Sequence, residues 1–249
     1  MLLVRFVLSP PSRHVRGCRG ESLTKSVKIA VQEGDFSEQR WQQYTEQALT
    51  ASGDMTMTDT LRLMSSFASA KVRDFRLYDR LCARVHSLLP GSGSLPPKDL
   101  RRLAVSLGRA RTFDSELMEA IADLIVDRVE EFRPRELVHI VEAYSRMPVQ
   151  SLNLFAIVAD ALPPYVYDLS VPEVAKLCRA FGEAMVYSQE LTDALCEEAH
   201  HRRHDFGTIE CLGFLDGLSY LSELPADMKR NDTETVAAFV VQISFKLQS

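Results

Sequence analysis

The sequence lacks the features that would place the chain in a membrane or cross-link it through cysteines. No window reaches the roughly 20 uninterrupted apolar residues that a membrane-spanning helix needs, and even the apolar stretch 120–126 is broken by Asp123. The five cysteines are odd in number and form no C-x-x-C pair, so neither a disulfide framework nor a zinc ribbon is indicated. We therefore expect a soluble body with mostly reduced, buried cysteines.

Catalytic motifs are missing as well. The chain has no nucleophile elbow, no H-E-x-x-H and no glycine-rich dinucleotide fingerprint. Cys196, His200 and His204 recur at intervals of four, a spacing that could present metal ligands on one helix. Cys196 falls in a buried column of the repeat described below, so a partly buried histidine is the preferred interpretation. The sequence thus predicts a protein that is not an enzyme, with no catalytic residues, no metal, no cofactor and no small-molecule substrate.

Acidic residues are scarce at the N-terminus. Residues 1–28 hold six lysines and arginines against the single acid Glu21, and they open with the apolar run 1–8. This composition is typical of an organellar transit peptide and predicts the mitochondrial matrix. A secretory signal fits less well, because Arg5 interrupts the apolar run and Pro10 follows it. A basic extension that is retained and grips a neighbour stays open as the alternative.

An internal repeat of about 37 residues dominates the rest of the chain. An apolar residue precedes the first helix of successive repeats at Leu95, Phe132, Leu169 and Phe206. Acids then fall in the first helical turn, where they meet the positive end of the helix dipole, at Asp59, Asp99, Glu136, Glu173 and Glu210. Two apolar columns four residues apart share one helix face: Leu63, Leu103, Ile140, Leu177 and Phe214, then Phe67, Leu107, Tyr144, Phe181 and Leu218.

A second helix follows in each repeat. Its predicted N-caps are Asp74, Asp114, Ser151 and Ser188. Its buried stripe contains Leu77, Leu117, Leu154 and Leu191, then Leu81, Ile121, Val158 and Leu195, then the small residues Cys82, Ala122, Ala159 and Cys196. Because one repeat cannot bury its own stripe, neighbours must stack.

We therefore predict an all-α fold, an α-solenoid of about five helix-turn-helix repeats within residues 57–249. Residues 29–56 form an N-terminal capping region with a helix over 37–52. The last repeat is expected to contain a loop at 225–232 and a closing helix beyond it.

The repeat resembles those of the heptatricopeptide and octotricopeptide families of organelles. The resemblance is carried by the period and by leucine-rich first helices such as those at 98–107 and 172–181, and it covers about residues 57–224. It implies an organellar protein associated with RNA or ribosomes. Members often end in a RAP domain, for which this chain has no room after Leu224, so the resemblance implies no nuclease activity.

One solvent-side column of the first helices is basic in four consecutive repeats, at Arg62, Arg102, His139 and Lys176, and Arg109 and Arg146 could widen it. Cations placed once per repeat could follow a phosphate backbone. The other interpretation is a solvated face with intrahelical ion pairs, such as Glu142 with Arg146, and the acidic composition, with a net charge of −5, favours it.

These observations predict a structural, RNA-associated subunit of a mitochondrial ribonucleoprotein, and among such assemblies they favour the mitochondrial ribosome. The expected partners are other protein subunits and rRNA or other organellar RNA, and no membrane insertion is expected. The alternative is a protein–protein scaffold in another mitochondrial complex, such as the respiratory chain or ATP synthase.

Overall fold

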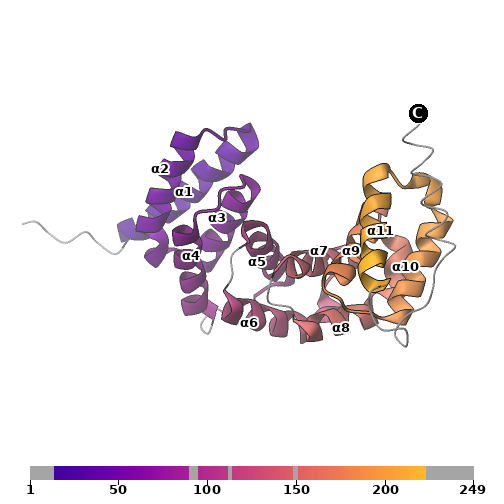
Figure 1. The fold of residues 1–249 in the computed structure, drawn as a ribbon. Coiled ribbons are helices and arrows are strands. Elements are labelled where there is room, and N and C mark those ends of the chain that lie inside the picture. Colours follow the sequence, from indigo (N-terminus) through magenta and orange to yellow (C-terminus); the bar gives the residue numbers. More distant parts are fainter. Residues whose placement is uncertain (1–13, 90–94, 112–113, 148–150, 223–249) are drawn as a thin grey trace, which may run out of the picture. The chain divides into compact units, whose positions relative to one another are not determined.

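The computed structural model describes residues 14–89, 95–111, 114–147 and 151–222 of the chain (Figure 1). Over these residues the regular elements are α-helices and short 3-10 helices, and no strand occurs among them. The all-α prediction is therefore confirmed. The chain divides into two compact units, residues 1–94 and 95–249.

The first unit consists of two helix pairs. Helix α1 packs against α2 and α3, and α2 also packs against α4, so the pair α1–α2 stacks on the pair α3–α4. The elements are α1 (His14–Glu33), α2 (Glu38–Ala51), the 3-10 turn η1 (Ser52–Asp54), α3 (Met57–Ser69) and α4 (Phe75–Leu88). Helix α2 lies at the predicted capping helix.

Helix α1 crosses residue 28, the boundary drawn from composition. Leu23, Val27 and Ala30 are buried on it, and the Thr24 hydroxyl donates to Asp59 Oδ1 at 3.5 Å. The second half of α1 therefore belongs to the hydrophobic core of the first unit. Whether any of residues 1–28 directs import stays a prediction.

The second unit continues the repeat. The first helices α5, α7, α9 and α11 pack side by side, as do the second helices α6, α8 and α10 (Figure 1). The α-helices are α5 (Pro97–Ala110), α6 (Ser115–Val126), α7 (Pro134–Ser145), α8 (Leu152–Ala161), α9 (Val171–Glu183), α10 (Gln189–His201) and α11 (Thr208–Ser222). The 3-10 turns η3 (Val129–Glu131), η4 (Pro163–Asp168) and η5 (Arg203–Asp205) lead into the next first helix. The predicted loop at 225–232 and the closing helix lie outside the described residues.

The 37-residue register is confirmed by burial. Every member of the two first-helix columns is buried except Leu218, which is half-buried. Every member of the second-helix stripe is buried, including the small residues that follow it. The four cysteines in the described ranges outside α1, Cys82, Cys178, Cys196 and Cys211, are free and buried.

The predicted helix starts are confirmed as well. The side chains of Asp74, Asp114, Ser151 and Ser188 each accept a hydrogen bond from the backbone N–H three residues on, at 3.0–3.4 Å. Such caps satisfy N–H groups that have no intrahelical partner. The predicted acids all lie in the first turn of their helices, and Glu173 accepts from both the N–H and the hydroxyl of Ser170, at 2.9 and 2.7 Å.

Three arginines have structural roles that the sequence did not reveal. Arg84 donates to the carbonyl of Met55, Arg128 to that of Leu95 and Arg202 to that of Leu169. Each bond joins the C-terminal part of a second helix, or a residue just after it, to a backbone carbonyl just before the first helix of the same repeat. The Arg128 and Arg202 bonds are equivalent in the repeat: in each, the arginine lies 33 residues after the residue whose carbonyl accepts the bond. These cations therefore serve the fold.

Glycines set how closely neighbouring first helices approach. A Cβ added at Gly182 would lie 2.5 Å from the carbonyl oxygen of Gly217, and one added at Gly217 would lie 2.5 Å from that of Cys178. A Cβ at Gly108 would lie 2.8 Å from Cβ of Ala143. Helices α9 and α11 thus meet backbone to backbone, and α5 approaches α7 almost as closely.

The proposed placement of three metal-ligand candidates on one helix is wrong. Cys196 and His200 lie on α10, but that helix ends at His201, and His204 lies in η5. Among the described residues, no group of three or more His, Cys, Asp or Glu side chains is arranged to hold a metal ion. In that same part of the chain, no helix is both long and apolar enough to cross a membrane.

Candidate nucleic-acid interface

A basic hollow lies over the first helices of the second unit. It has a volume of about 160 Å³ and is lined by Arg101, Val105, Gly108 and Arg109 of α5, His139, Glu142 and Ala143 of α7, Arg146 at the end of α7, and Lys176 of α9. Four permanent cations and one histidine thus face a single carboxylate. We call this site the basic hollow.

The hollow exists because of the helix packing. The close contact between Gly108 and Ala143 brings α5 against α7 without large side chains between them. Long cationic side chains from both helices and from α9 then stand around this depression of small residues. A flexible, partly exposed cation on each side is an arrangement suited to an anion with several oxygen atoms.

The structure brings together four of the six residues predicted from the sequence: Arg109, His139, Arg146 and Lys176. It adds Arg101, which the register had not singled out. Arg101 and Arg109 are eight residues apart on α5, so helical periodicity places them on the same face. That spacing is the signal that could have identified Arg101.

Two of the predicted residues lie elsewhere. Arg102 does not line the hollow and instead donates to Asp99 Oδ1 at 2.7 Å within α5. Arg62 is exposed on α3, in the first unit. Within the second unit the hollow includes His139 and Lys176 of the predicted column but not Arg102, and contact of the predicted residues with RNA stays a prediction.

Carboxylates neutralise part of the positive charge. Glu142 accepts from Arg146 at 2.7 Å and lies 4.0 Å from the Lys176 ammonium group. Arg101 Nε lies 3.4 Å from Glu136 Oε1, an ion pair without hydrogen-bond geometry. Arg109 is exposed and forms no ion pair with a described residue. Partly exposed ion pairs contribute modest free energy, so a phosphate group could compete with Glu142 for Arg146 and Lys176.

His139 is the titratable group of the hollow. Burial lowers the pKa of its imidazole below 6.5, and the positive charges of Lys176 and Arg101 lower it further, against the opposing effect of Glu142. The histidine is therefore mostly neutral at pH 7. An anion bound in the hollow would favour the protonated imidazole, because opposite charges raise the pKa of a histidine.

A second hollow adjoins the first and is less polar. Its volume is about 180 Å³, and it shares Glu142, Arg146 and Lys176 with the basic hollow. The rest of its wall is part apolar and part polar: small and apolar residues are Pro172, Ala175, Ala180, Ile209 and Gly213, and polar ones are Ser145, Arg179, Glu183 and Glu210. Ile209 is 82% exposed. The shared cations thus stand between a depression with an excess of positive charge and one in which three cations are matched by three carboxylates.

A carboxylate at the edge of the second hollow takes the place of the basic column. Glu183 occupies the register position of Arg109 and Arg146 one repeat further on. It accepts from Ser145 at 2.9 Å and from Arg179 at 2.8 Å. The positive column therefore ends at α9, and the basic surface is confined to α5, α7 and the start of α9.

Comparison with known proteins supports an RNA-related role. The sequence model of a family described as RNA-editing substrate-binding complex 6 protein matches residues 27–210, a range that includes the basic hollow and every residue of the second hollow except Gly213. No curated protein matches the chain.

Proposed function

Because the chain belongs to the RNA-editing substrate-binding complex 6 protein family, we propose that it is a non-catalytic, RNA-associated subunit of a mitochondrial ribonucleoprotein assembly. The family description favours an assembly that acts in RNA editing over the mitochondrial ribosome that the helical repeat alone had suggested. The mitochondrial location rests on the basic, acid-poor segment 1–28. The helical repeat supports a scaffold or binding role.

The basic hollow is the observation that carries the RNA-binding part of this proposal. Four permanent cations face one carboxylate in a volume of about 160 Å³, whereas the chain as a whole carries a net charge of −5. A local positive site on an acidic protein selects for an anion at that place rather than for polyanions over the whole surface. We assign a backbone phosphate of RNA to this hollow.

The apolar part of the adjoining hollow suggests the form of the RNA. A nucleobase stacked against Pro172 and Ile209 would lie next to a phosphate held by Arg146 and Lys176, because both of these cations line the two hollows. In a duplex the bases are paired inside the helix and could not reach such a wall. The proposed ligand is therefore single-stranded RNA, held by its backbone and by contact with a base.

A protein–protein scaffold in another mitochondrial complex is the second candidate. The acidic net charge and the partial pairing of the cations by Glu136 and Glu142 favour it. In that case an acidic partner segment would occupy the basic hollow in place of RNA.

Sedimentation of the tagged protein from mitochondrial extract separates the two candidates. We expect the protein to co-sediment with RNA in a large particle and to shift to lighter fractions after RNase treatment. Sequencing of the recovered RNA would distinguish editing substrates from ribosomal RNA. A particle that is unchanged by RNase and yields no crosslinked RNA would contradict the RNA proposal and leave the scaffold.

A further inference from the structure

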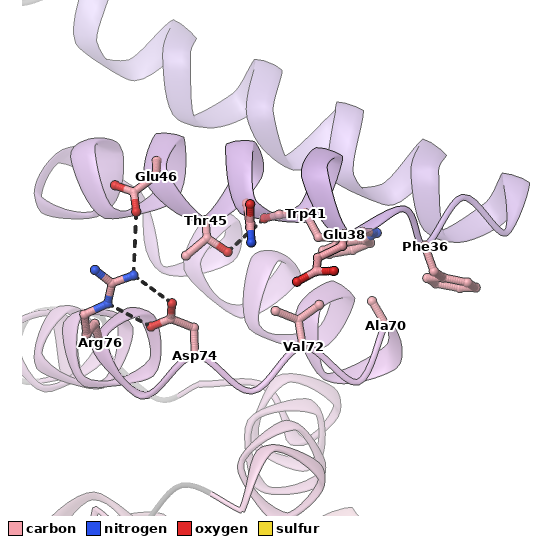
Figure 2. A pocket seen from close by; sticks show the side chains of 10 residues that line it. Phe36, Glu38, Trp41, Thr45, Glu46, Ala70, Val72, Asp74 and Arg76 are labelled. Carbon is pink, nitrogen blue, oxygen red and sulfur yellow. Dashed lines mark hydrogen bonds and ion pairs between the residues drawn. The ribbon is translucent and has the colours of Figure 1, made fainter.

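The first unit carries a groove whose chemistry is opposite to that of the basic hollow. It has a volume of about 330 Å³ and lies between α2 and the turn that joins α3 to α4 (Figure 2). Its lining residues are Phe36, Glu38, Trp41, Gln42, Thr45, Glu46, Ala70, Val72, Asp74 and Arg76. We call it the acidic groove.

One side of the groove is apolar and rigidly held. The Trp41 indole donates to the carbonyl of Asp35 at 2.9 Å and packs edge-on against Phe67, with ring centroids 5.1 Å apart. Phe36 stacks on Trp41 at 6.3 Å and is 53% exposed. Val72 contributes an apolar side chain on the opposite side of the groove (Figure 2). An exposed phenylalanine stacked on a buried tryptophan presents an aromatic face toward solvent.

The rim of the groove is acidic. Three carboxylates, those of Glu38, Glu46 and Asp74, line it together with one guanidinium, that of Arg76. Glu38 has no ion-pair partner among the residues that the structure describes, and the Glu46 side chain is 69% exposed. The groove therefore retains an excess of negative charge.

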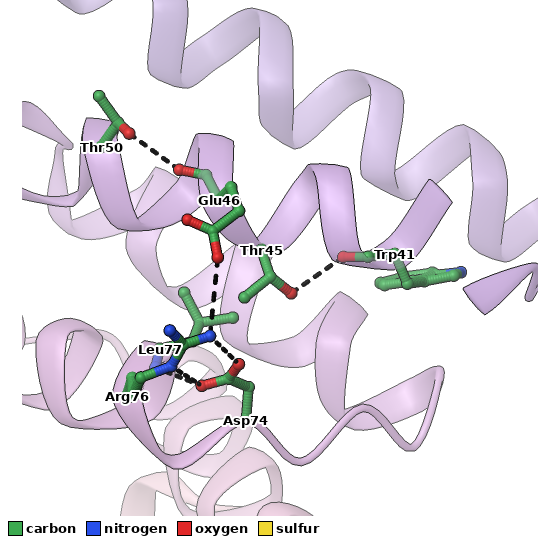
Figure 3. Close-up of polar contacts among 7 residues, drawn as sticks. All are labelled: Trp41, Thr45, Glu46, Thr50, Asp74, Arg76 and Leu77. Carbon is green, nitrogen blue, oxygen red and sulfur yellow. Dashed lines mark hydrogen bonds and ion pairs between the residues drawn. The ribbon is translucent and has the colours of Figure 1, made fainter. Parts of the chain in front are cut away.

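The internal arginine shows what this rim can hold. Arg76 Nη2 lies 3.0 Å from Asp74 Oδ2 and 3.6 Å from Glu46 Oε1, so one guanidinium bridges acids from α2 and from the start of α4 (Figure 3). This pairing lowers the pKa of the Asp74 carboxyl. The hydroxyl of Thr45 donates to the Trp41 carbonyl and that of Thr50 to the Glu46 carbonyl, so these donors are directed to their own helix and do not compete for the rim carboxylates.

We propose that the acidic groove binds a basic segment of a partner protein, with an arginine or lysine side chain inserted between the aromatic wall and the rim. The aliphatic part of such a side chain would lie against Val72 and Trp41. Its charged head would face Glu38 and Glu46 and could stack on the exposed face of Phe36. The volume suits one or two side chains. RNA does not fit this site, since three carboxylates would repel its phosphates.

The proposal does not depend on RNA binding by the second unit. It assigns the two units ligands of opposite charge: an anionic backbone to the basic hollow and a cationic peptide to the acidic groove. A subunit with both sites would hold RNA and a protein partner at the same time.

Trp41 is the single tryptophan of the chain, so its fluorescence reports on the groove directly. The probe is an acetylated and amidated peptide of alternating arginine and leucine, titrated into the full-length protein. We expect saturable binding that changes the Trp41 emission, and no change with the matched glutamate–leucine peptide. The double variant Glu38→Gln, Glu46→Gln should bind the arginine peptide about tenfold more weakly, because it loses two of the three carboxylates.

A matched control removes the same amount of charge elsewhere. Glu119 and Glu190 are exposed acids on α6 and α10, and Glu190, like Glu38, lies in the first turn of its helix. The double variant Glu119→Gln, Glu190→Gln should retain the wild-type affinity. As a second test, Ala70→Arg introduces a long side chain at the groove wall and should weaken peptide binding as well.

The outcomes decide the proposal. Equal weakening in both double variants would show non-specific attraction to an acidic protein and would overturn the assignment. Absence of any Trp41 response in the wild-type protein would also overturn it. So would an oligouridylate that competes with the peptide and loses affinity in the groove variant, because the occupant would then be RNA.

Discussion

Two glycines on the same helix should respond in opposite ways to the same substitution. Gly213 and Gly217 lie one turn apart on α11. A Cβ added at Gly213 meets nothing within 4 Å, whereas one added at Gly217 lies 2.5 Å from the Cys178 oxygen, 2.6 Å from the Cys178 carbonyl carbon and 2.7 Å from the Arg179 nitrogen. All three of these atoms are backbone and cannot move aside without α9.

The free-energy change follows from this geometry. Carbon atoms pack best at about 3.5–4.0 Å, so Gly217→Ala must push α9 and α11 apart by on the order of 1 Å. Overpacking of a close-packed site costs about 1–3 kcal/mol, and a rigid backbone contact belongs at the upper end. Alanine regains about 0.8–1.0 kcal/mol through its higher helix propensity. We expect Gly217→Ala to lower the free energy of unfolding by about 2 kcal/mol.

Gly213→Ala provides the control. It gains the helix propensity without the clash, so the free energy of unfolding should rise by up to about 1 kcal/mol. For a chain of this size 1 kcal/mol corresponds to a shift of about 2–4 °C in Tm. Circular dichroism melts should therefore show a fall of about 4–8 °C for Gly217→Ala and a rise of up to about 4 °C for Gly213→Ala. Equal stabilisation by both would refute the backbone contact between α9 and α11.

Two further predictions concern the N-terminus and the pH dependence. Deletion of residues 1–28 should lower Tm in the same melts, because it removes Leu23 and Val27 from the core of the first unit; a Tm equal to that of the full chain would contradict the packing of α1. Affinity for an oligouridylate should rise as the pH falls from neutral into the acidic range, because the bound phosphate favours the protonated form of His139, whose pKa is lowered in the free protein by burial. The rise in affinity should be absent in His139→Asn. In the wild-type protein without RNA, the free energy of unfolding should fall over the same pH range, because the unfolded state binds the proton more readily. The same pH dependence of affinity in the wild-type protein and in His139→Asn would contradict this role of His139.

The repeat and its helix starts could be predicted because they depend on local chemistry. Asp114 and Ser188 cap helices through contacts within three residues, and such contacts leave a direct trace in the sequence. The apolar columns recur because each helix has only one buried stripe. Two levels of the same pattern, caps and columns, thus agree without knowledge of the tertiary structure.

The site could be predicted only in part, since it depends on how far each helix is rotated about its axis. Arg101 and Arg102 are neighbours in the sequence but lie about 100° apart around α5, and only the packing against α7 decides which one faces the hollow. The register selected Arg102, which pairs with Asp99. Likewise, a half-buried acid such as Glu142 gives no sign in the sequence that it lies 4.0 Å from Lys176 on the next first helix.

Some structural features had no sequence signal at all. Lys71, Arg111 and Met185 follow the first helices α3, α5 and α9 with positive φ angles of 54° to 58°. Such left-handed positions are usually marked by glycine or asparagine, so long side chains there conceal the helix end. The strongly basic composition around α1 favoured a targeting segment and concealed that its second half is part of the core.

The most direct test of RNA binding by the basic hollow is the salt dependence of affinity for an oligouridylate. The double variant Arg109→Gln, Lys176→Gln removes two cations from the hollow, and the control Lys98→Gln, Arg133→Gln removes two exposed cations that do not line it. Each lost phosphate contact lowers the slope of log affinity against log salt by about 0.7 for a single strand. Our account predicts a slope reduced by about 1.4 in the hollow variant and a wild-type slope in the control. Equal slopes in the two variants, at unchanged helicity and Tm, would contradict it.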